Sequence, residues 1–96
     1  MDYRASLHSQ IKQLYAALRE AEHTYHIITH ESLPQLKHLF ELNRSSIESG
    51  GDLFAYMNLL EQKLTLEEQQ SCAKAYYLRT KAKLTALTGE IGRAHV

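Results

Sequence analysis

The stretch IESGGDL, from Ile47 to Leu53, contains the only adjacent glycines of this 96-residue chain. Gly50 and Gly51 can adopt left-handed backbone conformations without a steric penalty, so they can end a long helix. Asp52, directly after them, can accept a hydrogen bond from a free amide in the first turn of a following helix. The stretch therefore predicts a tight turn at residues 49–52 between two long helices.

The composition on both sides of this turn is typical of helices. Residues 1–46 contain no glycine and a single proline, and residues 53–88 contain neither. Leu, Ala, Glu, Gln and Lys, which favour helices, are frequent throughout. We therefore predict an all-α fold, a long antiparallel two-helix coiled-coil hairpin.

The predicted hairpin forms one domain over residues 1–90. Its helices are expected at about 3–48 and 52–88, with Gly89 as the cap that ends the second helix. Residues 91–96 are expected to form a flexible tail.

Charge and cysteine content exclude several classes of function. The chain has 11 basic and 11 acidic residues, so the net charge gives no reason to expect nucleic acid as a partner. No apolar run approaches the 20 residues of a transmembrane helix, and no signal-peptide pattern is present. The chain is therefore expected to be cytosolic or part of a longer exported protein. Cys72, the single cysteine, is expected to be a small packed residue.

The first helix carries two apolar stripes with coiled-coil spacing. The first consists of Ile11, Leu14, Leu18, Ala21, Tyr25 and Ile28, and the second of Leu33, Leu36, Phe40, Asn43 and Ile47. The second stripe is displaced by one residue from the first. Pro34 lies at this displacement, and a proline clashes with the carbonyl four residues earlier, so we predict a kink near Pro34. Asn43 is a polar residue of a kind that fixes the register of a coiled coil.

The second helix carries two stripes that we name after their first residues. The Leu53 stripe consists of Leu53, Met57, Leu60, Leu64, Ser71, Ala75, Leu78 and Ala82. The Leu59 stripe consists of Leu59, Leu66, Ala73, Thr80 and Leu87. At 100° per residue the two stripes lie on nearly opposite sides of the helix, and one neighbouring helix covers only one of them. We therefore expect a second neighbour, so that oligomerisation completes a helical bundle, with a dimer or larger species for this chain.

Residues 33–90 contain a series of short segments in a characteristic order. They are Leu33-Pro34, Gly50-Gly51, Leu59-Leu60-Glu61-Gln62, Ala75-Tyr76-Tyr77 and Leu84-Thr85-Ala86-Leu87-Thr88-Gly89. In this series the chain resembles the TolC-like outer-membrane efflux proteins, in particular their heavy-metal cation efflux branch. That family shows a Leu-Pro, a Tyr-x-x-Gly tip, a Leu-Leu-Asp-Ala-Gln segment and a closing Leu-x-x-Leu-x-Gly. Ile47 replaces the aromatic residue of the family's tip, and Glu61 replaces its aspartate.

The resemblance implies that this chain is part of a trimeric exit duct, in the periplasmic portion of an outer-membrane protein. In that family, paired helical hairpins build a periplasmic tunnel, and their tips meet a periplasmic adaptor protein. An inner-membrane pump takes part indirectly. The implied adaptor contact here consists of Ile47, Ser49, Gly50, Gly51, Asp52 and Leu53.

Three histidines form the only cluster of possible metal ligands. His23, His26 and His30 fall within about 60° of one another on a helix, and imidazoles one turn apart can share a zinc or copper ion. A polar, histidine-rich surface explains the same spacing without a metal. No phosphate loop, nucleophile motif or paired carboxylates are present, so we expect neither enzymatic activity nor a cofactor.

Three functions therefore remain open from the sequence. The first is a non-catalytic wall element of an efflux duct, possibly for heavy-metal cations. The second is a free-standing coiled-coil hairpin that acts as a scaffold. The third is a small helical protein that binds metal through His23, His26 and His30.

Overall fold

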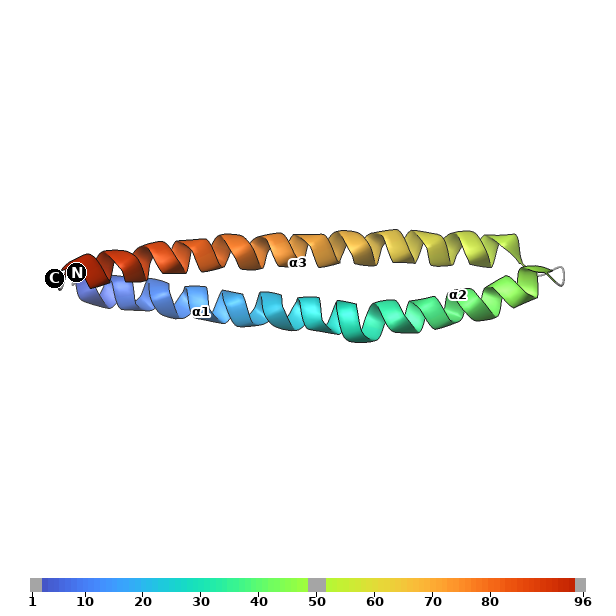
Figure 1. Ribbon diagram of the computed structural model, residues 1–96, viewed down its shortest axis with the longest axis horizontal. Helices are drawn as coiled ribbons and strands as arrows, with labels where there is room; N and C mark the ends of the chain where they lie inside the picture. Colours follow the sequence, from blue (N-terminus) through green and yellow to red (C-terminus); the bar gives the residue numbers. More distant parts are fainter. Residues whose placement is uncertain (1–2, 49–51, 95–96) are drawn as a thin grey trace.

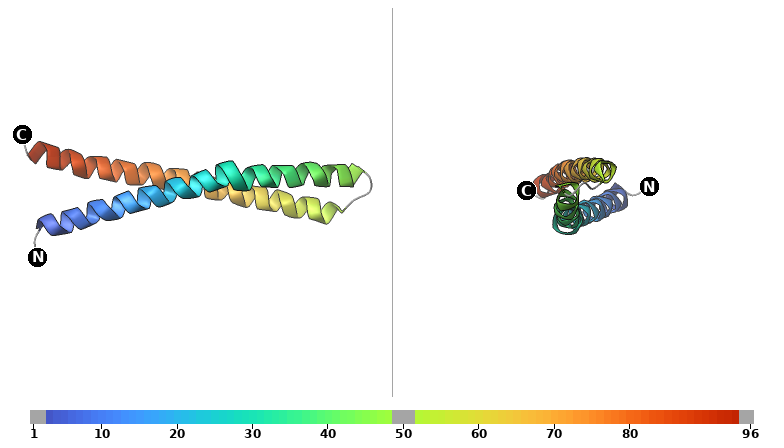
Figure 2. Two further views of the ribbon diagram at one scale, coloured as in Figure 1. Left: turned by 90° about the horizontal axis from the view of Figure 1, so that it is seen from below. Right: turned by 90° about the vertical axis from the view of Figure 1, so that its right-hand side faces the viewer.

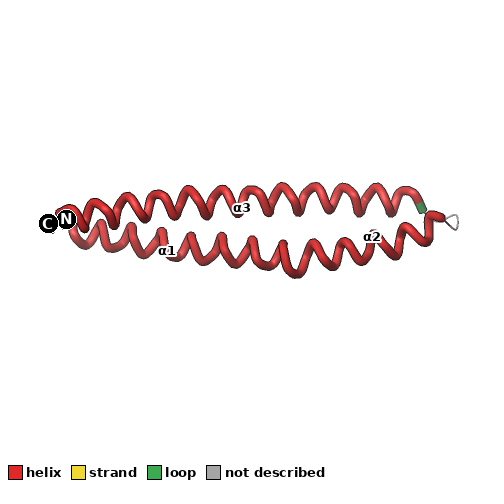
Figure 3. Tube along the Cα trace, in the orientation of Figure 1, coloured by secondary structure: helices red, strands yellow, loops and turns green. Residues whose placement is uncertain are grey.

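The protein is two antiparallel helical rods. The computed structural model describes residues 3–48 and 52–94, with the side chains described as far as Gly89. One rod consists of α1 (Tyr3–Ile27), the π-helical turn η1 (Ile28–Ser32) and α2 (Leu33–Glu48). The other rod is α3 (Leu53–Ala94), and the described residues contain no strand (Figures 1 and 3). The all-α hairpin predicted from the sequence is confirmed.

The hairpin is strongly elongated. It measures 70 × 25 × 15 Å, and its radius of gyration is 20.9 Å. A compact domain of 100 residues has a radius of gyration of about 13 Å. The start of α1 and the end of α3 lie at the same end of the molecule, where they spread apart, and the end of α2 and the start of α3 lie at the other end (Figures 1 and 2). We call these the terminal end and the tip.

The two rods cross each other at a shallow angle near the middle of the molecule (Figure 2). Both predicted stripes of the first rod lie in the seam between the rods, and every member of them is buried or half-buried. Ala21, Ile28 and Leu36 are the most covered, at 4–5% exposed. The heptad pattern therefore identified the packing face of the first rod.

The turn η1 explains the one-residue displacement between these stripes. The Leu33 N–H donates to the carbonyl of Ile28, a bond from residue i to residue i−5 that adds one residue to the turn. The added residue restores the phase of the seam, so both stripes face α3. Pro34 has no N–H to donate, and the wider turn ahead of it relieves the constraint its ring places on the preceding backbone. The rod bends at this junction without breaking, as Figure 1 shows.

The Leu59 stripe is the face of α3 that lies against the first rod. All five members are buried or half-buried, and Ala73 and Thr80 are the most covered of them, at 9% and 4% exposed. Five further residues alternate with the stripe to complete a heptad seam. They are Tyr56, Lys63, Gln70, Tyr77 and Leu84. The sequence pattern missed these residues because Lys63 and Gln70 interrupt their apolar character.

A polar contact joins the rods close to η1. The Gln70 side-chain amide donates to the hydroxyl of Thr29 at 2.9 Å, and both groups are partly buried. Asn43 also lies in the seam, half-buried, but its buried Oδ1 has no hydrogen-bond partner in the described part of the chain. The side-chain hydrogen bond between the rods at this level of the seam is the one between Thr29 and Gln70.

The second helix extends further than predicted. It continues through Gly89 to Ala94, so the predicted end at Gly89 is wrong, and residues 91–94 are helical where a flexible tail was expected. A glycine inside a helix costs about 1 kcal/mol relative to alanine, which weakens a helix but does not end it. Residues 95 and 96 lie outside the described residues.

Candidate docking surface

The Leu53 stripe runs along a face of α3 outside the seam and is open to solvent, although Leu53, Leu60 and Leu78 also border the first rod. Leu53, Leu64 and Met57 are 57–61% exposed, and Leu78 and Leu60 are 54% and 41% exposed. Ser71, Ala75 and Ala82 are also exposed. Large apolar side chains repeated along one face of a helix mark a surface that packs against a partner.

The hairpin itself buries little. No described side chain is less than 2% exposed, and the seam between the rods is a single layer of residues. A chain of this size has little interior when it forms only two helices. Of the eleven large hydrophobic side chains that are exposed in the described part of the chain, five belong to the Leu53 stripe.

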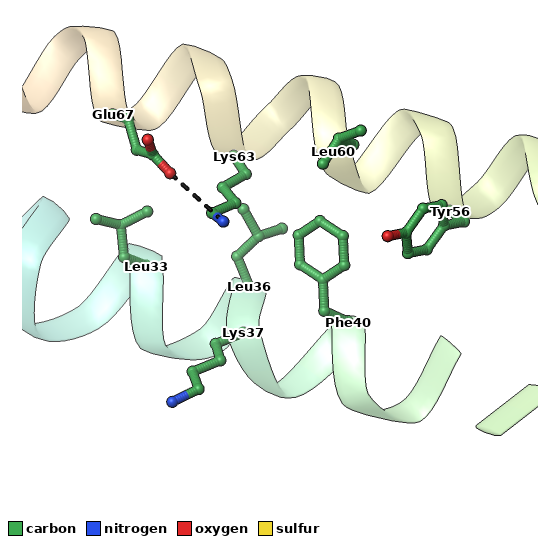
Figure 4. A pocket seen from close by; sticks show the side chains of 8 residues that line it. All are labelled: Leu33, Leu36, Lys37, Phe40, Tyr56, Leu60, Lys63 and Glu67. Atoms are coloured by element: carbon green, nitrogen blue, oxygen red, sulfur yellow. Dashed lines mark ion pairs between the residues drawn. The ribbon is translucent and has the colours of Figure 1, made fainter. Parts of the chain in front are cut away.

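A shallow groove between α2 and α3 widens this apolar surface toward the tip. It has a volume of about 430 Å³ and is lined by Leu33, Leu36, Lys37, Phe40, Tyr56, Leu60, Lys63 and Glu67. Leu36 and Phe40 point toward α3, whereas Lys37 points away from the groove (Figure 4). The Phe40 and Tyr56 rings meet edge to face, with their centres 5.6 Å apart.

One ion pair lies at the rim of this groove. Lys63 Nζ is 3.7 Å from Glu67 Oε1, one helical turn away on α3 (Figure 4). Both side chains are about half exposed, and such pairs stabilise a helix by about 0.3–0.5 kcal/mol. With an apolar floor and one ion pair at its rim, the groove is suited to holding an apolar side chain of a partner.

At the tip, Asp52 caps α3 as predicted from the sequence. The Phe54 N–H donates to Asp52 Oδ1 at 2.9 Å, which satisfies one of the free amides of the first turn. Ile47 is half-buried, while Leu53 is 60% exposed and Phe54 82% exposed. Of the predicted adaptor contact, Ser49, Gly50 and Gly51 lie outside the described residues.

The sequence pattern missed three exposed apolar residues near the tip. Phe54 follows the capping residue, and Leu39 and Leu42 lie on the outer side of α2 at 48% and 57% exposed. The heptad spacing did not reveal them because they lie outside both stripes. Their size and exposure identify them only once the packing face is known.

Charge is unevenly distributed along α3. The part near the tip carries Asp52, Glu61, Glu67 and Glu68 but only one basic residue, Lys63. The part beyond it carries Lys74, Arg79, Lys81 and Lys83, with no acidic residue between 69 and 89. The Lys81 Nζ lies 5.9 Å from the centre of the Tyr77 ring. In the described part of the chain, Glu61, Lys74 and Arg79 have no ion-pair partner.

The three histidines are not assembled into a site. The His26 and His30 rings lie 4.5 Å apart, centre to centre, and tilted by 41°. Across the described residues, no group of three or more His, Cys, Asp or Glu side chains is placed to hold a metal ion. The structure thus brings together His26 and His30 but does not add His23 as a third ligand.

Of the other residues quoted from the sequence, Cys72 and Tyr76 lie on the surface. Cys72 is exposed, so the expectation that it is packed is wrong. Tyr76 is 48% exposed and Tyr77 is half-buried in the seam. Within the described ranges, no helix is both long and apolar enough to cross a membrane.

Comparisons of the chain with protein-family models, with curated proteins and with solved structures gave no match. The resemblance to the TolC-like family therefore stays a prediction. What the structure establishes is a helical hairpin with one covered and one open apolar face on α3.

Proposed function

We propose that this chain is a non-catalytic packing element, a helical hairpin whose α3 takes a further helix along the Leu53 stripe. The observation that carries the proposal is the exposure of that stripe along α3 from Leu53 to Ala82. Covering a half-exposed Leu or Met side chain stabilises an assembly by about 1 kcal/mol, and the stripe contains five such side chains.

The assembly we propose is the tunnel wall of an outer-membrane exit duct in an efflux system. A wall helix needs a neighbour on each side, and α3 carries apolar stripes on two nearly opposite sides. The hairpin is 70 Å long, with its tip at the end opposite the start of α1 and the end of α3. These features support a wall element whose tip meets a periplasmic adaptor, with three copies per duct and an inner-membrane pump as an indirect partner.

The packing role is tested on the Leu53 stripe. Leu60→Asp together with Leu64→Asp introduces charge on the open face and should weaken assembly while leaving the helicity of the hairpin unchanged. Leu59→Asp with Leu66→Asp is not an equivalent test, because those residues lie in the seam between the rods and we expect their substitution to unfold the hairpin. Sedimentation and circular dichroism measure the two effects. Normal assembly of the Leu60→Asp/Leu64→Asp variant would show that the Leu53 stripe does not mediate assembly.

The adaptor contact is tested at the tip. Replacing Gly50 and Gly51 by bulky residues in the full-length transporter should abolish efflux and leave trimers intact, because a Cβ obstructs close backbone contact. Thermal unfolding of the same variant separates this effect from local strain at the turn. A folded, trimeric variant that exports at the normal rate would contradict the proposed adaptor contact and, with it, the proposed duct.

A free-standing coiled-coil hairpin that associates with itself is the second candidate. It is favoured by the division of α3 into an acidic part near the tip and a basic part beyond it, which makes the helix complementary to a reversed copy of itself. Genomic sequence on either side of residues 1–96 separates the candidates, since a duct requires flanking β-strand segments and a signal peptide.

A further inference from the structure

We infer that, in this chain by itself, the partner of the Leu53 stripe is α3 of a second copy, which runs antiparallel about a two-fold axis between Glu67 and Glu68. The inference rests on the proposed packing role of the stripe and names its occupant. In a duct, the same stripe would instead meet a helix of a neighbouring hairpin.

The spacing of the stripe is symmetric about this axis. When α3 is reversed about the midpoint of Glu67 and Glu68, every member of the stripe meets another member. The facing pairs are Leu53 with Ala82, Met57 with Leu78, Leu60 with Ala75, and Leu64 with Ser71. A reversed copy therefore continues the apolar contact along the whole stripe without a shift in register.

The sizes of the paired residues favour the same arrangement. In three of the four pairs a leucine faces an alanine or a serine, so the space between the helices stays nearly constant along their length. A parallel pair in register places leucines and methionine against one another near the tip and, from Ser71 onward, small residues against one another except at Leu78. The spacing between the two helices would then be uneven, with overpacking on the tip side of Ser71 or gaps on the other side.

Charge provides an independent argument for the antiparallel direction. Reversal places the acidic part of one α3, with Glu61 and Glu68, beside the basic part of the other, with Arg79. Glu61 and Arg79 lie on the same flank of the stripe, and their side chains extend toward each other across such an interface. A parallel pair instead places like charges together along both parts, which is unfavourable.

The first rod offers no comparable surface for a second copy. Its outer face on α1 carries Ala5, Lys12, Ala16, Arg19 and His23, all exposed and none a large apolar residue. On α2 only Leu39 and Leu42 are large, apolar and exposed, which is too short a stretch to cover the Leu53 stripe. Therefore α3 itself is the element of this chain that fits the stripe.

The orientation is tested by disulfide cross-linking of the full chain with Cys72→Ser as background. In the inferred pair Glu68 lies next to its own copy, so Glu68→Cys should cross-link under mild oxidation. Glu61 lies roughly 20 Å along the axis from its own copy, so Glu61→Cys should not cross-link. Cross-linking of both variants indicates a parallel pair and overturns the inference, while the packing role remains. Cross-linking of neither variant also overturns it.

Association is measured on the same chain by sedimentation equilibrium. Leu60→Asp/Leu64→Asp should raise the dimer dissociation constant at least about a hundredfold, because each substitution acts twice across a two-fold axis. Glu68→Gln should tighten the dimer about two- to fivefold by removing the like charges at the axis, whereas Glu20→Gln on α1 should leave it unchanged. A monomer at millimolar concentration, or no response to Glu68→Gln, overturns the inference. The proposed packing role is contradicted by a different result, namely that the Leu60→Asp/Leu64→Asp variant of the full-length protein still assembles.

Discussion

The two halves of the hairpin differ in which large side chains they expose to solvent. Near the tip, the exposed large residues are aliphatic or Phe, as at Leu42, Phe54 and Leu64, which are 57–82% exposed. Toward the terminal end they are mostly tyrosines, Tyr3, Tyr15 and Tyr76, whose hydroxyls can remain solvated. The seam between the rods runs through both halves without such a difference. The outer surface near the tip is therefore the part that most needs a partner.

The junction between the halves gives the strongest test of this comparison. Deleting Glu31 together with Pro34→Ala removes the added residue of η1 and brings both stripes into one heptad series, so the hairpin should keep its stability within about 1 kcal/mol. Deleting Glu20 instead rotates Ala21, Tyr25 and Ile28 by about 100° relative to the residues before them and should abolish cooperative unfolding. Urea denaturation followed by circular dichroism compares the two. Equal loss in both would show that η1 does not correct the phase of the seam.

The seam itself should be equally strong in both halves. Leu36→Ala near the tip and Leu84→Ala near the terminal end should each lower the free energy of unfolding by about 2–3 kcal/mol, since the side chains are 4% and 7% exposed. Leu42→Ala, at a residue that is 57% exposed, is the matched control and should cost less than about 0.5 kcal/mol. A much larger cost at one end than at the other would contradict a uniform seam.

How much of this arrangement the sequence predicts depends on the kind of residue involved. The heptad spacing located the packing face of the first rod, and Asp52 located the start of α3, because both signals are local. The displacement at Pro34 was visible, but a kink and a π-helical turn both explain it, and only the backbone geometry separates them. Which stripe of α3 faces the first rod was undetermined, since both stripes are apolar.

The contact at the middle of the hairpin has an intermediate effect. A double-mutant cycle with Thr29→Val and Gln70→Leu should give a coupling of about 1 kcal/mol, because the two side chains form a partly buried hydrogen bond of 2.9 Å. Chemical denaturation of the four variants measures it. No coupling would mean that the rods are aligned by apolar packing alone.

The smallest expected effect is at the start of α3. Asp52→Ala removes the acceptor of the Phe54 N–H and should cost about 0.5–1 kcal/mol, whereas Asp52→Asn should preserve most of the stability. Thermal unfolding compares the two variants. If asparagine costs as much as alanine, the carboxylate acts through its charge on the helix dipole and the cap contributes little.

The single-layer seam has a consequence for the order in which the molecule opens. Each pair of seam residues is stabilised only by the pairs next to it along the hairpin. The two rods can therefore separate from either end while the contacts in the middle remain intact. Amide hydrogen exchange should therefore be fastest near Tyr3 and Glu48 and slowest close to Thr29 and Gln70. A partner that binds the exposed stripe of α3 would slow amide exchange from the tip inward. The amides that become protected would therefore show which part of the hairpin the partner covers.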